Sequence, residues 1–200
     1  MSDVERNPPY LIENHPFSDD VAEIETWGDV VRIPPLQLVV WAALTPAGQA
    51  ELPDRPRWIP TVVDAGCSDN LVIAESHLRD WAGLDPFELK TIGFDKGRTA
   101  SGEETELLPR IEADLWLYCT TDGASLSHRG PGNRRSPAFR FELDRGFLLF
   151  DESQSMPGPP WPLLGAAALH RAGVQLEVDY DALRFSLRVR ADRPGGLLID

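Results

Sequence analysis

The sequence predicts a mostly β protein, in which a closed or folded sheet carries one or two short helices. Short apolar runs recur along the chain, between turn residues, and only two segments have helical character. The first of these runs, Leu36 to Leu44, has the length of one strand. With 200 residues and 42% hydrophobic content, the chain is long enough to bury one core.

The first 34 residues differ in composition from the rest of the chain. They hold eight acidic side chains against two basic ones, together with four prolines. We expect residues 1–34 to form an acidic, largely extended arm, with Trp27 to Ile33 docking as an extra strand. Residues 35–192 are then the folded domain, and residues 193–200 are a C-terminal tail.

The most informative strand ends in an acidic turn. Residues 59–63 are apolar and β-branched apart from one proline, and Asp64 follows them directly. The next residues are small: Ala65, Gly66, Cys67 and Ser68. An ordinary strand-end turn explains this pattern, since Asp and Gly are common turn residues. The alternative is a reactive carboxylate presented on a loop that leaves room for a substrate.

A short helix and a hairpin are predicted next. Ser76 is a candidate N-cap, residues 78–82 place apolar side chains on one face, and Gly83 ends the helix. Leu89 to Phe94 and Leu107 to Tyr118 are apolar runs separated by a polar, glycine-containing segment. That pattern indicates two strands joined by a tip, as in a surface hairpin or in a lid over a site.

The C-terminal third predicts a strand, a helix and a hairpin in succession. Leu163, Leu164 and Gly165 form a short apolar segment, and Ala166 to Ala172 favour a helix. Gly173 suits the position that follows a helix end, and Val174 to Val189 alternates around an acidic turn.

In their order and spacing these segments resemble the retropepsin-like (retroviral-type) aspartic proteases. Residues 62–68 match the active-site strand and loop of that family, and residues 163–165 match its second apolar-apolar-Gly segment. The resemblance implies a retropepsin-like acid-protease fold with one lobe per chain, and Asp64 as the catalytic residue. It also implies that residues 163–165 support the active-site loop. The expected flap tip, which would close over an extended peptide or protein substrate, comprises Thr99, Ala100, Ser101 and Gly102.

Peptide hydrolysis by aspartates needs two carboxylates that share one proton. A second Asp-x-Gly occurs at residues 144–146, but its position between two apolar runs favours a hairpin turn. We therefore expect a homodimeric aspartic endopeptidase in which each subunit supplies Asp64. No cofactor is expected, and no Cys/His cluster has the spacing of a metal site.

One departure from the family pattern leaves alternatives open. Ala65 stands where the family has Thr or Ser, whose hydroxyl bonds to the partner's active-site loop. A peptide-binding or assembly module that kept the fold and lost the chemistry is the alternative that Ala65 favours. A third possibility is an unrelated small β-barrel that carries Asp-Ala-Gly as a turn.

Composition excludes several classes of partner. A formal net charge of −13 argues against nucleic acid, because phosphate binding needs clustered Lys and Arg. No apolar run approaches the 18 or so residues of a membrane span, and the N-terminus lacks a signal-peptide pattern. We expect a cytoplasmic protein with no membrane partner. Its two cysteines form no disulfide framework, and Cys67 is expected to be a small buried thiol rather than a nucleophile paired with His77.

Overall fold

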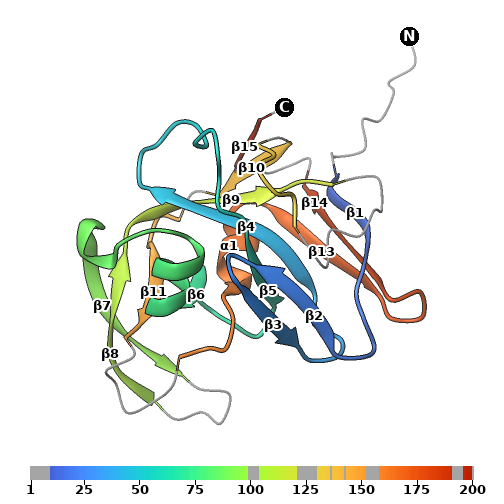
Figure 1. The fold of residues 1–200 in the computed structure, drawn as a ribbon, viewed down its shortest axis with the longest axis horizontal. Coiled ribbons are helices and arrows are strands. Elements are labelled where there is room, and N and C mark those ends of the chain that lie inside the picture. Colours follow the sequence, from blue (N-terminus) through green and yellow to red (C-terminus); the bar gives the residue numbers. More distant parts are fainter. Residues whose placement is uncertain are drawn as a thin grey trace.

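The computed structural model describes residues 10–98, 104–120, 130–135, 137–141, 143–151, 158–190 and 196–199. These residues form a mostly β structure, as the sequence predicts, with three short helices where one or two were expected (Figure 1). None of the described helices is long and apolar enough to cross a membrane.

Ten strands form the main sheet, in the order β15-β10-β9-β4-β5-β12-β6-β11-β8-β7. The sheet has two ends, β15 and β7, so among the described residues it does not close on itself as the sequence analysis allowed. Its strands are β4 (Val39–Pro46), β5 (Ile59–Asp64), β6 (Leu71–Ala74), β7 (Thr91–Arg98), β8 (Glu104–Ile111), β9 (Ala113–Tyr118), β10 (Ala138–Phe141), β11 (Phe147–Phe150), β12 (Leu163–Gly165) and β15 (Gly196–Ile199).

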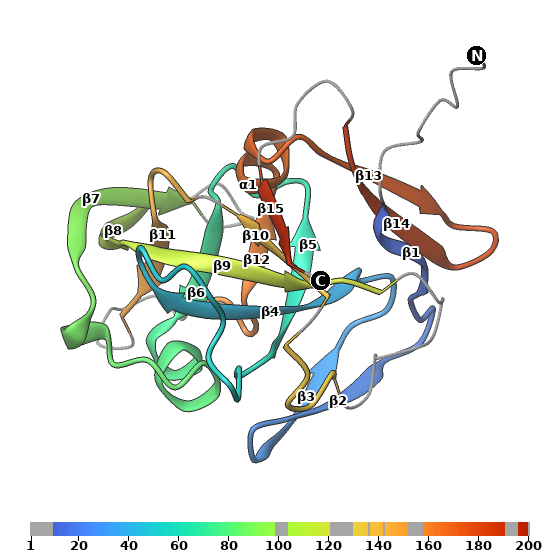
Figure 2. The ribbon, with the colours of Figure 1, turned by 90° about the horizontal axis from the view of Figure 1, so that it is seen from above.

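A three-stranded sheet and a separate hairpin complete the β structure. The small sheet has the order β1-β14-β13, with β1 (Tyr10–Pro16), β13 (Val174–Asp179) and β14 (Arg184–Val189). The hairpin consists of β2 (Ala22–Thr26) and β3 (Asp29–Ile33). The β7–β8 pair and the β13–β14 pair lie at opposite ends of the molecule in both ribbon views (Figures 1 and 2).

The N-terminal segment is more integrated into the fold than the expected arm. Its described residues are extended, and β3 covers most of the segment that we expected to dock. However, β1 pairs with β14, and Leu11, Ile12 and Ile24 are buried. Charge composition suggested a solvated arm, but the apolar residues between the acids pack into the core. At the other end, residues 196–199 of the expected tail form β15, which pairs with β10.

The helices are short and differ in detail from the sequence prediction. η1 (His77–Trp81) is a π-helix that buries Leu78 and Trp81 as expected, but Ser76 has helical dihedral angles and its side chain does not cap. Gly83 ends this turn at φ +71°. η2 (Pro86–Glu88) is a 3₁₀ turn, and α1 (Ala166–Arg171) matches the predicted helix.

The buried apolar side chains of the described residues form two clusters. The larger extends from β1 to β14 and contains Trp116, Phe139 and Phe147. The smaller lies between β6, β8 and β11 and comprises Val72, Leu108, Leu148 and Phe150. This smaller cluster fixes the base of the β7–β8 hairpin against the strand that follows the Asp64 loop.

Candidate active site

Asp64 lies at the carboxyl end of β5, beside the strand that we expected to support it. β12 pairs in parallel with β5, and Gly165 is the register partner of Asp64. The other edge of β12 pairs antiparallel with β6. The two strands that flank residues 65–70 are therefore joined through β12.

Gly165 lies in unusually close contact with the loop after Asp64. A Cβ atom built on Gly165 would lie 2.0 Å from the backbone oxygen of Asp69 and 2.8 Å from that of Cys67. The amide of Gly165 donates to the oxygen of Asn70 (3.0 Å), and that of Ala166 donates to the oxygen of Cys67 (2.9 Å). Only a residue without a side chain fits here, because the contacting atoms are backbone atoms on both sides.

The Asp64 carboxylate is half-buried and turns back onto its own loop. Its Oδ1 accepts a hydrogen bond from the amide of Gly66 (2.8 Å), and its backbone oxygen accepts one from Cys67 (3.1 Å). Ala65, Gly66 and Ser68 are exposed. The loop thus presents a carboxylate held by a backbone donor, next to a surface of small side chains.

Cys67 is half-buried beside the smaller core cluster. Burial raises the pKa of its thiol to about 11, and the nearby Asp69 and Asp64 charges act in the same direction, against an opposing backbone hydrogen bond from Asp69. The thiol therefore stays protonated near neutral pH, which makes it a poor nucleophile. Cys119 is fully buried, with a pKa raised by burial to about 12.

The predicted flap strands are present as an antiparallel pair. β7 pairs with β8, and the run from Leu107 to Tyr118 divides into β8 and β9. The expected tip residues, Thr99, Ala100, Ser101 and Gly102, lie outside the described residues. The base of the hairpin contacts the Asp64 loop through Arg110, whose Nη2 lies 2.6 Å from an Asp69 carboxylate oxygen.

Three polar residues around the loop carried no recognisable signal in the sequence: Asn70, Arg110 and Arg171. Asn70 is buried, and its side-chain amide donates to the oxygen of Gly146 (3.0 Å) and accepts from Arg171 (3.1 Å). Arg110 comes from β8, Arg171 comes from α1, and Asn70 ends the loop, so only the fold brings these three residues together. Because Arg110 and Arg171 are 41 and 101 residues away from their partners in the loop, no sequence motif links them to it.

The second Asp-x-Gly forms a turn, as expected. The amide of Gly146 donates to the oxygen of Leu143 (2.7 Å), and Gly146 has φ +59°. Asp144 is exposed and pairs with Arg171. The expected hairpin is wrong, however, because β10 pairs with β9 and β15 while β11 pairs with β6 and β8. This turn connects two separated parts of the main sheet.

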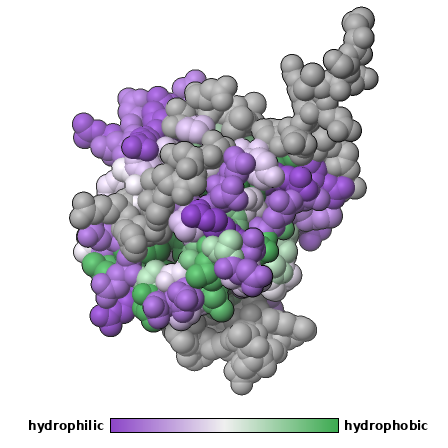
Figure 3. All heavy atoms as spheres, turned by 90° about the vertical axis from the view of Figure 1, so that its right-hand side faces the viewer, coloured by the Kyte–Doolittle hydropathy of each residue, from purple (hydrophilic) through white to green (hydrophobic). Residues whose placement is uncertain are grey.

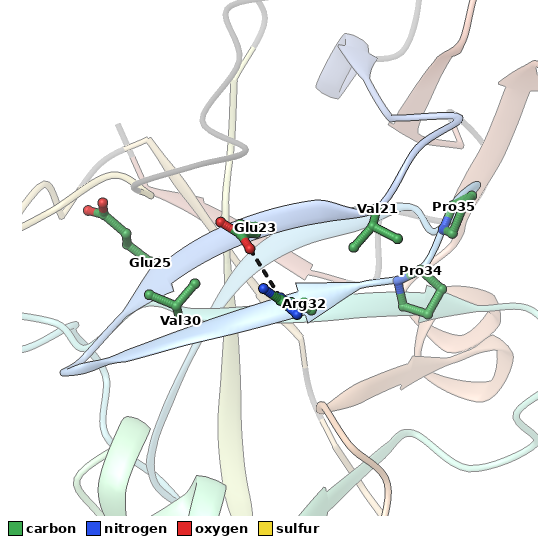
Figure 4. Close-up of a pocket in the computed structure, with 7 residues that line it drawn as sticks. All are labelled: Val21, Glu23, Glu25, Val30, Arg32, Pro34 and Pro35. Atoms are coloured by element: carbon green, nitrogen blue, oxygen red, sulfur yellow. Dashed lines mark hydrogen bonds and ion pairs between the residues drawn. The ribbon is translucent and has the colours of Figure 1, made fainter.

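One hollow of the described surface is lined by residues other than Asp64 and its loop. It has a volume of about 1070 Å³ on the β2–β3 hairpin, where Glu23 and Arg32 form an ion pair across the strands (Figure 4). Its lining residues are Val21, Glu23, Glu25, Val30, Arg32, Pro34 and Pro35. Apolar residues gather in the lower half of the face shown in Figure 3. We assign no chemistry to the hollow on the β2–β3 hairpin.

No protein-family model matches the chain, and a search of curated proteins finds no similar sequence. Among the described residues, no group of three His, Cys, Asp or Glu side chains is placed to hold a metal ion. The class that fold and site define is a mostly β protein with a carboxylate on a glycine-containing loop.

Proposed function

We propose that this chain is an aspartic endopeptidase of the retropepsin type, active as a homodimer with one Asp64 from each subunit. The observation that carries the proposal is the position of Asp64 at the end of β5, with Gly165 of the parallel strand β12 packed against the loop that follows. The β7–β8 hairpin, joined to that loop through Arg110, supports the same assignment.

A second subunit is required by the chemistry. Two carboxylates a few ångströms apart share one proton, so that one can act as base on water while the other polarises the peptide carbonyl. Asp144 does not suit the second role, because it lies in a turn and is paired with Arg171. The exposed residues Ala65, Gly66 and Ser68 offer a surface of small side chains on which a second loop can approach.

The substrate in this proposal is an extended peptide. It would lie between the two Asp64 loops and the β7–β8 hairpins, hydrogen-bonded through its main chain, with alternate side chains in pockets. In this proposal the cleft is completed only by the partner subunit.

A catalytically degenerate binding or assembly module is the second candidate, and Ala65 favours it. Ala65 is exposed and has no hydroxyl to donate across a subunit boundary. The lost hydrogen bond would cost only about 1 kcal/mol of dimer stability. A small displacement of the paired carboxylates, however, can cost about a hundredfold in rate.

The test is cleavage of a diverse peptide pool from pH 4 to 7, read by mass spectrometry. Asp64→Asn is the variant, because an amide oxygen can still accept from Gly66 while the acid is lost. Asp144→Asn is the matched control for the other Asp-x-Gly. We expect the wild type and the control to cut the same bonds and Asp64→Asn to cut none. A folded wild-type dimer without cleavage would favour the binding module.

Subunit mixing tests the shared site directly. If each site needs two Asp64 residues, mixed dimers with Asp64→Asn are inactive. Equal amounts of the two chains should therefore reduce wild-type activity to about half after exchange, since half of the wild-type subunits then sit in mixed dimers. Unchanged activity would mean that one chain holds a complete site.

A further inference from the structure

Arg110 connects three segments that are distant in the sequence. Its Nη2 lies 2.6 Å from Asp69 and 2.9 Å from Asp95, and its Nε donates to the same Asp95 oxygen at 3.2 Å. Its Nη1 donates to the backbone oxygen of Arg145 at 3.4 Å. One planar guanidinium thus joins the Asp64 loop, the first strand of the β7–β8 hairpin and the turn before β11.

The two ion pairs of Arg110 differ in exposure. The side chain of Arg110 is 17% exposed and that of Asp69 is 20% exposed, whereas Asp95 is 55% exposed. An ion pair shielded from water interacts more strongly than an exposed one, and it holds its partners in one geometry. The link to the Asp64 loop is therefore the rigid one, and the link within the hairpin is the weaker one.

Asp69 is well placed to transmit this contact to Asp64. Its backbone oxygen is the atom that packs against Gly165, and its side chain is the one that Arg110 holds. The loop is thus fixed between β12 on one side and β8 on the other. Gly165 and Ala166 supply backbone bonds from β12 and α1, but the contact from β8 is a single side chain.

We propose that Arg110 is a positioning residue that sets the β7–β8 hairpin relative to the Asp64 loop. The proposal rests on the proposed function, because it takes the hairpin as the flap over the site. In this role Asp69 transmits the position of the loop and Asp95 transmits the position of the flap. The two carboxylates should therefore affect different kinetic constants.

Kinetics of four variants test this division. Asp69→Asn should lower kcat about tenfold with KM within about twofold, because it loosens the loop that carries Asp64. Asp95→Asn should raise KM about threefold to tenfold with kcat nearly unchanged, and Arg110→Lys should do both. Lys90→Gln is the control, since it removes an exposed ion pair with Glu112 from the same hairpin. Equal effects of Arg110→Lys and this control overturn the proposal.

Hydrogen exchange of the purified protein provides a readout that does not depend on activity. In Arg110→Lys, we expect backbone amides of residues 65–70 and 92–95 to exchange about tenfold faster, while Lys90→Gln leaves both segments unchanged. Unchanged exchange in Arg110→Lys overturns the proposal. If the wild type cleaves no peptide, the proposed function fails, and exchange still decides whether Arg110 links the segments. Should Arg110→Lys not fold, Asp69→Asn and Asp95→Asn carry the same comparison.

Discussion

Replacing Gly165 by alanine is the sharpest test of how the Asp64 loop is held. The added Cβ atom would lie 2.0 Å from the backbone oxygen of Asp69, whereas real Cβ contacts are essentially never closer than 3.0 Å. The two backbone segments must therefore separate by about 1 Å. The hydrogen bond from Gly165 to Asn70 and the bond from Ala166 to Cys67 join the same segments, so the separation weakens both of them.

The expected cost follows from these contacts. Overpacking of a core position costs about 1–3 kcal/mol, and the upper value applies here because backbone atoms cannot rotate away. Loss of two hydrogen bonds adds about 1 kcal/mol each. Gly165→Ala should thus lower the free energy of unfolding by about 3–5 kcal/mol, which corresponds to a fall in Tm of roughly 10 °C for a chain of this size.

The assay is urea or thermal unfolding followed by tryptophan fluorescence. Gly93→Ala is the matched control, since it also lies in the main sheet and a Cβ atom there meets nothing within 4 Å. We expect that control to change the stability by less than about 0.5 kcal/mol. The reasoning would be refuted by a Gly165→Ala protein within about 1 kcal/mol of the control, because the loop would then yield without cost.

Three further predictions follow from the same structure. Gly146→Ala should lower the free energy of unfolding by about 3 kcal/mol, because φ is +59° and the added Cβ lies 2.1 Å from the backbone oxygen of Ile111. Gly132→Ala, at φ +64° with nothing within 4 Å of the added Cβ, should lower it by only about 1 kcal/mol, and equal losses in chemical unfolding would contradict the role of the Ile111 contact. With a pKa near 11, Cys67 should react with iodoacetamide at pH 8 about a hundredfold more slowly than a free thiol, and peptide mapping that finds rapid alkylation would disprove this. A hydrogen bond from the Arg110 guanidinium lowers the pKa of Asp95, so the Asp95 charge stabilises the fold above the carboxyl's ordinary pKa, and the contribution disappears as pH falls through the lowered pKa. Asp95→Asn should therefore cost about 0.5 kcal/mol at pH 7 and progressively less as the pH is lowered, and a difference in urea unfolding that does not change with pH would contradict this.

Local patterns predicted those parts of the fold whose partners are near in sequence. The helix of residues 166–171 and the β13–β14 pair follow from residue types over a few turns of chain. The Asp64 strand was recognisable because its β-branched residues end in small turn residues. The β7 and β8 strands could be predicted because a polar, glycine-containing segment separates two apolar runs. The second run, from Leu107 to Tyr118, contains parts of two strands, β8 and β9.

Long-range pairings escaped the sequence analysis because no local signal encodes them. The acidic neighbours of β1 predict an extended arm outside the folded domain, yet β1 pairs with β14, and Leu11 and Ile12 are buried. Arg110 and Arg171 are separated from their partners in the loop by 41 and 101 residues. Charged residues of this kind look like ordinary surface residues until the fold brings their partners to them.

The pairing of β1 with β14 also constrains how the protein is made. Tyr10 to Pro16 pair with residues 184–188, so β1 is synthesised more than 160 residues before the strand that it pairs with. Until then Leu11 and Ile12 remain uncovered, and contacts between such distant residues form slowly. While the residues between the two strands are being synthesised, the nascent chain therefore exposes an apolar segment, and such segments favour aggregation.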